Sequence, residues 1–167
     1  MAIVFAAEVV ATFDNLAGGN WQRLFDFNNG PGIDSIWLGL TFNTNTIGFV
    51  IEQNGTAYSL EVPVAIDEGV ETTWNVSVDD TGTLTIVKNG VEIGSQNFGI
   101  AAIPNDVLHT NNLIGDSPFP ADAPLIGSVS SIDVETTLTH GFDIDFTDSA
   151  NTVGTYDGSD RAEVLDA

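Results

Sequence analysis

Residues 73–95, TWNVSVDDTGTLTIVKNGVEIGS, decide the fold of this chain of 167 residues. Apolar and polar side chains alternate over 74–79 and again over 83–88, which is the period of a strand with one buried and one wet face. Turn residues separate the two runs. Asn89-Gly90 then predicts a tight hairpin, because both central residues of a type I′ turn need positive φ. The segment therefore predicts three consecutive antiparallel strands.

Strand-like runs continue on both sides of this meander, and no stretch has a convincing helical pattern. The other expected strands cover 3–13, 22–28, 35–42, 46–53, 57–62, 112–115 and 127–135, with a final set within 141–164. Turns rich in glycine and asparagine separate them. About eleven strands in one chain predict an all-β fold, a two-sheet antiparallel β-sandwich or jelly roll.

Charge and composition limit the possible partners. The chain has 24 acidic and 3 basic residues, a net charge of −21, which excludes nucleic acid and anionic membrane because like charges repel. Cationic partners such as Ca²⁺ fit, although the carboxylates could equally keep a secreted or salt-adapted protein soluble. The absence of cysteine excludes disulfides and thiolate chemistry. Glu8 and the lack of a basic region argue that 2–13 is a strand and not a signal peptide, so any secretion signal is expected outside the segment.

Four segments in order resemble a known family. They are WQRLFDFNNG at 21–30, the meander from Trp74 to Ser95, NLIG at 112–115 and GSVSSIDV at 127–134. Their order and spacing are similar to those of the laminin-G-like jelly-roll domains of the concanavalin A-like superfamily. The resemblance implies two curved antiparallel sheets, commonly with bound calcium, in a carbohydrate- or protein-binding module of a secreted or surface protein.

The order of the strands departs from this family at one point. Such domains usually begin with a strand resembling F-D-G-x-D-x-x-V, whereas YDGSDRAEV stands at 156–164 here. We therefore expect one domain over 1–167, in which 141–167 supplies the strand usually found first, by circular permutation or by a boundary within a tandem array. Alternatively, 141–167 begins the next domain or forms a tail.

Calcium is the cofactor that the sequence favours, because loops dense in Asp, Asn and Gly supply the oxygen ligands that Ca²⁺ takes. The resemblance implies that Asp133 is a structural calcium ligand, with Asp157 and Asp160 in a strand nearby. Two further clusters qualify by composition. One is Asp26, Asn28, Asn29 and Asp34, and the other is Asp116 and Asp122 in a loop rich in proline.

Catalysis is not expected. A glycoside hydrolase needs two carboxylates that face each other across a cleft. The candidate pairs are Asp133 with Glu135 and Asp143 with Asp145. Ser131 and Thr136 stand where the E-x-D-x-x-E pattern of related endoglucanases has its flanking acids. A lyase would need basic, Tyr or His groups, which are few here, and His109 and His140 lack a nucleophile elbow or zinc partners, so we expect them at the surface.

Carbohydrate recognition would use exposed aromatic rings beside polar loops. Trp21, Tyr58 and Phe119 qualify, although Trp21 could equally be buried, while Trp37 and Trp74 alternate in phase with aliphatic residues and are expected in the core. The sequence thus predicts a non-catalytic, Ca²⁺-stabilised binding or adhesion module for a glycan or a surface protein, located outside the cell beside other domains of its parent chain. A structural spacer in a repetitive adhesin is the alternative, and a carbohydrate-active enzyme domain is the third possibility.

Overall fold

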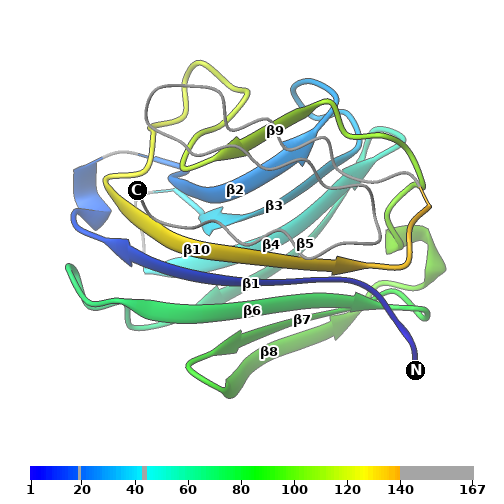
Figure 1. Cartoon of the computed structure of the whole chain (residues 1–167), viewed down its shortest axis with the longest axis horizontal. Helices are drawn as coiled ribbons and strands as arrows, with labels where there is room; N and C mark the ends of the chain where they lie inside the picture. Colours follow the sequence, from blue (N-terminus) through cyan, green and yellow to red (C-terminus); the bar gives the residue numbers. More distant parts are fainter. Residues whose placement is uncertain (19, 43–44, 140–167) are drawn as a thin grey trace.

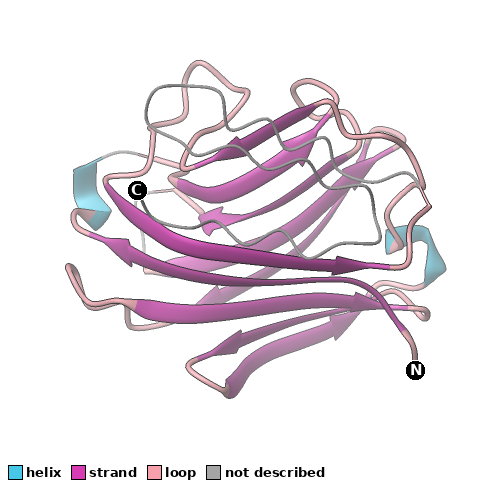
Figure 2. Ribbon diagram, viewed as in Figure 1, coloured by secondary structure: helices cyan, strands magenta, loops and turns pink. Residues whose placement is uncertain are grey.

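Two antiparallel sheets of five strands stack face to face (Figures 1 and 2). In this computed structural model, residues 1–18, 20–42 and 45–139 are described. Sheet A has the strand order β10-β1-β6-β7-β8, and sheet B has the order β5-β4-β3-β2-β9. The strands are β1 Ile3–Phe13, β2 Arg23–Asn28, β3 Ser35–Leu40, β4 Thr46–Gln53, β5 Thr56–Pro63, β6 Thr72–Asp79, β7 Thr83–Lys88, β8 Val91–Asn97, β9 Asn111–Ile114 and β10 Gly127–Thr136. The predicted all-β sandwich is confirmed.

Helical structure is minor within these residues. Two short 3₁₀ segments, η1 (Leu16–Gly18) and η2 (Ile100–Ala102), are the helices in the described part of the chain. Neither these nor any other described segment forms a helix long and apolar enough to cross a membrane. The segment 141–167, which we expected to supply a further strand, lies outside the described residues.

The predicted meander forms β6, β7 and β8, which are neighbours in sheet A. Ser77 pairs with Thr85, and Thr85 pairs with Ser95, so polar residues of the three strands share the outer face. Asn89 and Gly90 have φ values of 50° and 78°, as a type I′ hairpin requires. The local sequence therefore fixes both the strands and the turn between β7 and β8.

Alternation places one row of each strand in a shared core. From sheet A, Phe5, Val9 and Trp74 point inward, and Phe25 and Phe49 meet them from sheet B. All five are fully buried. Phe5 lies 6.4 Å from Phe25 and 6.4 Å from Phe49, measured between ring centroids, so the aromatic rings join the two sheets directly.

The turn between β6 and β7 requires glycine for two reasons. Gly82 has a φ of 77°, and a Cβ atom added there would lie 1.9 Å from the carbonyl oxygen of Gly99. The backbone of Phe98 donates to the Gly82 carbonyl at 3.0 Å, which holds the two segments together. A side chain at this position would therefore separate the turn from the segment that follows β8.

We expect Gly82→Ala to lower the free energy of unfolding clearly more than Gly55→Ala. Both residues have positive φ, which costs an alanine about 1–2 kcal/mol, but nothing lies within 4 Å of a Cβ at Gly55. The difference between the two variants in urea unfolding therefore isolates the clash with Gly99. Equal destabilisation would show that the Gly99 segment moves away at no cost.

Candidate functional site

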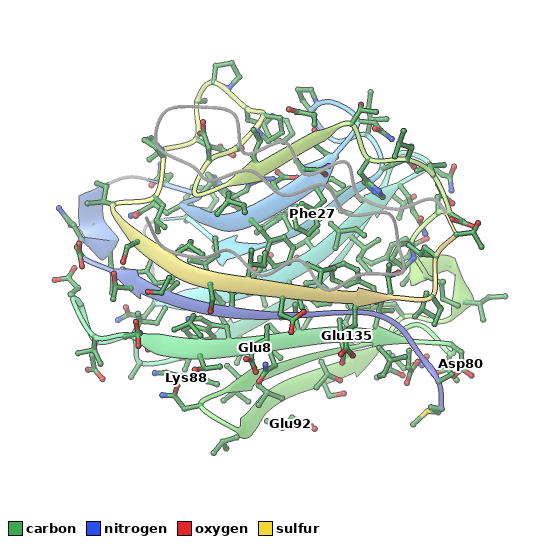
Figure 3. The ribbon with its side chains drawn as sticks, viewed as in Figure 1. Glu8, Phe27, Asp80, Lys88, Glu92 and Glu135 are labelled. Carbon is green, nitrogen blue, oxygen red and sulfur yellow. The ribbon has the colours of Figure 1, made fainter. Side chains whose placement is uncertain are left out.

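A groove of about 370 Å³ lies on the outer face of sheet A. The strand register sets Ala6 between Glu135 and Ser77, and sets Glu8 between Asp133 and Asn75. Figure 3 shows Glu8 and Glu135 on the neighbouring strands β1 and β10. The side chains of Ala6 and Ser77 are short, so the groove deepens between the longer carboxylates on either side.

The groove combines charged acceptors with amide and hydroxyl groups. Asn75 Nδ2 donates to Glu8 Oε2 at 2.7 Å, which orients both side chains. Glu8 lies directly opposite Asp133, and like charges in this arrangement destabilise a strand pair. Further along the same face, the hydroxyls of Thr85 and Ser95 lie 3.1 Å apart. This surface therefore suits a ligand that brings several hydrogen-bond donors.

The outer face of sheet B is closed over a buried guanidinium. Arg23, on β2, is only 3% exposed and forms an ion pair with Asp26 on the same strand. Its second ion pair, at 3.2 Å, reaches Asp122 in the proline-rich loop, which we define as residues 116–124. Ser117 of that loop donates to Asp122 at 2.6 Å. Arg23 therefore fastens the proline-rich loop to the sheet.

Aromatic rings enclose the same guanidinium. The Cζ atom of Arg23 lies 4.4 Å from the ring centroid of Trp37 and 5.3 Å from that of Phe119. Trp37 is buried, but it lies outside the core between the sheets, on the face of β3 opposite to Ile36 and Leu38. The predicted burial of Trp37 is therefore confirmed, although Trp37 packs outside the cluster between the sheets. Trp37 packs against the Arg23 guanidinium instead. Because both faces of β3 are covered, the alternation of side chains does not predict which of the two faces Trp37 occupies.

Asp26 is held in a dense polar network. Its carboxylate accepts hydrogen bonds from Ser35 Oγ at 2.7 Å and from Asn28 Nδ2 at 3.0 Å, in addition to Arg23. Burial raises the pKa of Asp26, although Arg23 and these donors oppose the change. The pKa of Glu52 is also raised by burial, with Arg23 again opposing. Arg23 is thus the cation that opposes the effect of burial on both carboxyl groups.

The residues predicted as calcium ligands are dispersed or already paired. No group of three or more Asp, Glu, His or Cys side chains among the described residues is placed to hold a metal ion. Asp26 and Asp122 share Arg23 as their cation, so this pair does not fit Ca²⁺. Asn29 and Asp34 accept hydrogen bonds from Thr110 and Asn105, respectively, and so tie distant loops together, while Asp116 accepts one from the neighbouring Ser117 backbone. Asp133 lies in the groove of sheet A, and Asp157 and Asp160 lie outside the described residues.

The predicted sugar-stacking residues divide into two places. Trp21 is half-buried, with its ring centroid 6.2 Å from Trp37 and 5.0 Å from Phe42. Phe119 covers Arg23 on the same side of the molecule. Tyr58 instead packs against the core and lies 6.1 Å from Phe98, measured between ring centroids. Trp21 and Phe119 therefore belong to one surface, and Tyr58 does not.

His109 is not the surface residue that we expected. It is 1% exposed, and burial lowers the pKa of its imidazole, with Asp34 opposing. Asn105 donates to Asp34 at 2.8 Å and so draws the loop that carries His109 back onto the end of sheet B. The sequence around His109 gives no sign of this long-range contact. His140 lies outside the described residues.

The groove also contains residues that sequence reasoning did not select. Glu8, Asn75 and Ser77 were assigned to strands, and no binding role was predicted for them. The available signal was the polar outer row of the meander, but a polar row is equally typical of an ordinary solvated sheet face. The missing information was the strand order, which sets β1 between β6 and β10.

Several solved structures share this fold. The CBM40 domain of the Ruminococcus gnavus IT-sialidase, bound to α2,3-sialyllactose, has 18% identity and a TM-score of 0.60, and the match covers 80% of this chain and 76% of that one. Tailspike protein 2 of an Escherichia coli O157:H7 bacteriophage has 15% identity and a TM-score of 0.58, over 96% of this chain and 23% of that one. Domains LG4-5 of the mouse laminin α1 chain have 11% identity and a TM-score of 0.55, and the match covers 80% of this chain and 38% of that one.

These similarities concern the fold and not the sequence family. No protein-family model matches the chain. No curated protein matches its sequence either. The predicted likeness to laminin-G-like sandwiches is thus confirmed as a shared jelly-roll architecture, which the CBM40 domain has as well.

We expect Arg23→Met to lower the free energy of unfolding by about 3–5 kcal/mol, because it leaves buried carboxylates without a cation. Lys88→Met is the control. Lys88 Nζ donates to the Ala65 carbonyl near the surface and lies 5.7 Å from the ring centroid of Trp74, so its loss should cost about 1 kcal/mol or less. Adding Asp26→Asn to Arg23→Met should recover part of the loss in urea unfolding. Equal effects of the Arg23 and Lys88 variants would contradict a structural role for the buried cation.

Proposed function

We propose that this protein is a non-catalytic carbohydrate-binding module whose groove on sheet A receives a neutral glycan. The proposal rests on one observation, a hollow on a rigid sheet face that carries carboxylate, amide and hydroxyl groups beside short apolar side chains. The fold is shared with the CBM40 domain bound to sialyllactose, which supports a carbohydrate as the ligand.

The polar groups of the groove match the hydroxyls of a sugar. A carboxylate has about four acceptor positions, so Glu8 can accept sugar hydroxyls while it holds Asn75. The Asn75 amide offers both a donor and an acceptor, and Ser77 adds a hydroxyl that can do either. Ala6 and Val87 provide apolar contacts for the C–H groups of a pyranose ring.

Charge favours a neutral ligand over an anionic one. The groove presents Glu8, Asp133 and Glu135, and the whole chain has a net charge of −21. A carboxylate on a sialic or uronic acid would be repelled both on approach and at contact. We therefore propose a different specificity from that of the sialyllactose-bound CBM40 domain, despite the common fold.

We propose binding without hydrolysis. Ser131, Asp133 and Glu135 alternate along β10, so the first position of this row carries a hydroxyl instead of an acid. The tailspike similarity does not favour hydrolysis here, since a fold by itself does not imply an activity. We further propose that the module acts in adhesion, outside the cell, as one part of a longer protein.

The groove is tested by titration calorimetry with neutral oligosaccharides such as cellotetraose and mannotetraose. We expect Glu8→Gln and Asn75→Ala to weaken binding about tenfold or more, because a hydrogen bond to a charged group contributes about 1.5–3 kcal/mol. Glu61→Gln is the matched control, since Glu61 is an exposed acid on β5 of the other sheet. Sialyllactose should bind more weakly than the neutral sugars.

Three results would contradict this proposal. Binding that is unchanged in the Glu8 and Asn75 variants would place the site elsewhere. Failure of every glycan to bind at millimolar concentration would favour a spacer. Release of shorter sugars during a long incubation, abolished by Glu135→Gln, would show an enzyme.

Calcium stabilisation is a separate proposal, supported by the acidic composition of the chain and by the resemblance to laminin-G-like domains. If it holds, Ca²⁺ should raise the melting midpoint and EDTA should lower it, because a ligand that binds only the folded state stabilises that state. Asp133→Asn should remove part of this response. Mg²⁺ at the same concentration serves as the control for ionic strength. Superimposable melting curves in Ca²⁺ and in EDTA would exclude a stabilising site.

A further inference from the structure

We infer a second glycan-binding surface, independent of the groove, at an aromatic shelf formed by Trp21 and Phe42. Trp21 lies two residues before β2, and Phe42 lies two residues after β3, so both belong to the sheet B side of the molecule. Their ring centroids are 5.0 Å apart, with a tilt of 49° between the planes. Phe42 is 57% exposed, and it is the one aromatic side chain among the described residues that is exposed rather than buried or half-buried.

The backbone at both residues has a conformation that bulky side chains disfavour. Among the described residues, the non-glycine positions with positive φ are Trp21, Asp34, Phe42, Asn54 and Asn89. Asn and Asp tolerate this region, and the two asparagines each precede a glycine in a hairpin. Trp21 and Phe42 have φ values of 61° and 57°, in a region that bulky side chains rarely adopt. Such strain gathers at functional sites.

Contacts with neighbouring residues of sheet B hold the two rings of the shelf in place. The Trp21 backbone donates to the Phe42 carbonyl at 3.3 Å, which joins the two strained residues to each other. The Trp21 ring meets Trp37 edge to face, at an angle of 81°. Trp37 in turn packs against the Arg23 guanidinium. The rings are therefore ordered before a ligand arrives, which reduces the entropy lost on binding.

The chemistry around the shelf selects a sugar ring as its occupant. An exposed ring face stacks well against the C–H face of a pyranose, and the exposed amides of Asn20 and Asn45 flank the shelf in the chain and can bind hydroxyls. Two rings are too small an area for a stable protein interface.

The shelf and the groove lie on different sheets, so one module could hold two segments of a glycan. Two weak sites on one body strengthen the binding of a multivalent ligand through effective concentration. This inference does not depend on the groove, since no residue is common to the two surfaces. An extended or branched neutral polysaccharide is the ligand class that would use both.

The test uses the full chain with Asn75→Ala as the background, which impairs binding in the groove. Binding at the shelf is then measured by saturation-transfer NMR with cellotetraose and mannotetraose. We expect Phe42→Gly to weaken the remaining binding about tenfold, because a stacking partner is lost, and Phe42→Tyr to retain it. Phe42→Gly should also keep or raise the melting midpoint relative to Phe42→Ala, because glycine relieves the positive φ.

The combination of lost binding with unchanged or improved stability is specific to a functional ring. A lower midpoint for Phe42→Gly than for Phe42→Ala would overturn the inference, since the strain would then not exist. So would binding that survives in both variants, or the absence of saturation transfer to either sugar in the background protein. Saturation transfer that is present in the unmodified protein and absent from the Asn75→Ala background would assign all binding to the groove and would also reject the shelf.

Discussion

The buried guanidinium of Arg23 is the interaction on which the sheet B side of the molecule depends. One cation satisfies Asp26 within β2 and Asp122 in the proline-rich loop, residues that lie far apart in the sequence. Trp37 and Phe119 enclose it, so the charge is removed from water on every side. Such a pair contributes less to stability than to specificity, because desolvation offsets most of the attraction. Its effect is to fix where the loop lies.

The two outer faces of the sandwich consequently differ in what they can do. On sheet B, the proline-rich loop and the Arg23 network cover β2 and β3, and the rings of Trp21 and Phe42 lie beside the ends of these two strands. On sheet A, short residues such as Ala6 and Ser77 leave a hollow between carboxylates. A recognition surface can form there because nothing in the core depends on those outward side chains. Both faces are supported by the same ring-to-ring contacts between the sheets.

Sequence reasoning succeeded where the physical cause is local. The strands Ile3–Phe13, Thr46–Gln53, Thr83–Lys88 and Val91–Asn97 have the predicted bounds, and Asn89-Gly90 forms the predicted hairpin. It failed where a residue's surroundings come from distant segments. His109 is buried by a loop that folds back, and Asp26 and Asp122, assigned to two separate clusters, share one arginine. Composition alone does not distinguish a carboxylate that binds a metal from one that binds a guanidinium.

The sequence by itself determined that this chain is an all-β sandwich, because side-chain alternation and turn chemistry act over a few residues and need no partner. The sequence also determined the acidic net charge, which disfavours anionic ligands. Only the tertiary structure decided which acids are neutralised and which line a groove, since those outcomes depend on the register of β1 against β10 and β6 and on the closure of the proline-rich loop. The strand register and the position of the loop depend on the burial of side chains from many distant segments. A short stretch of sequence therefore cannot predict them.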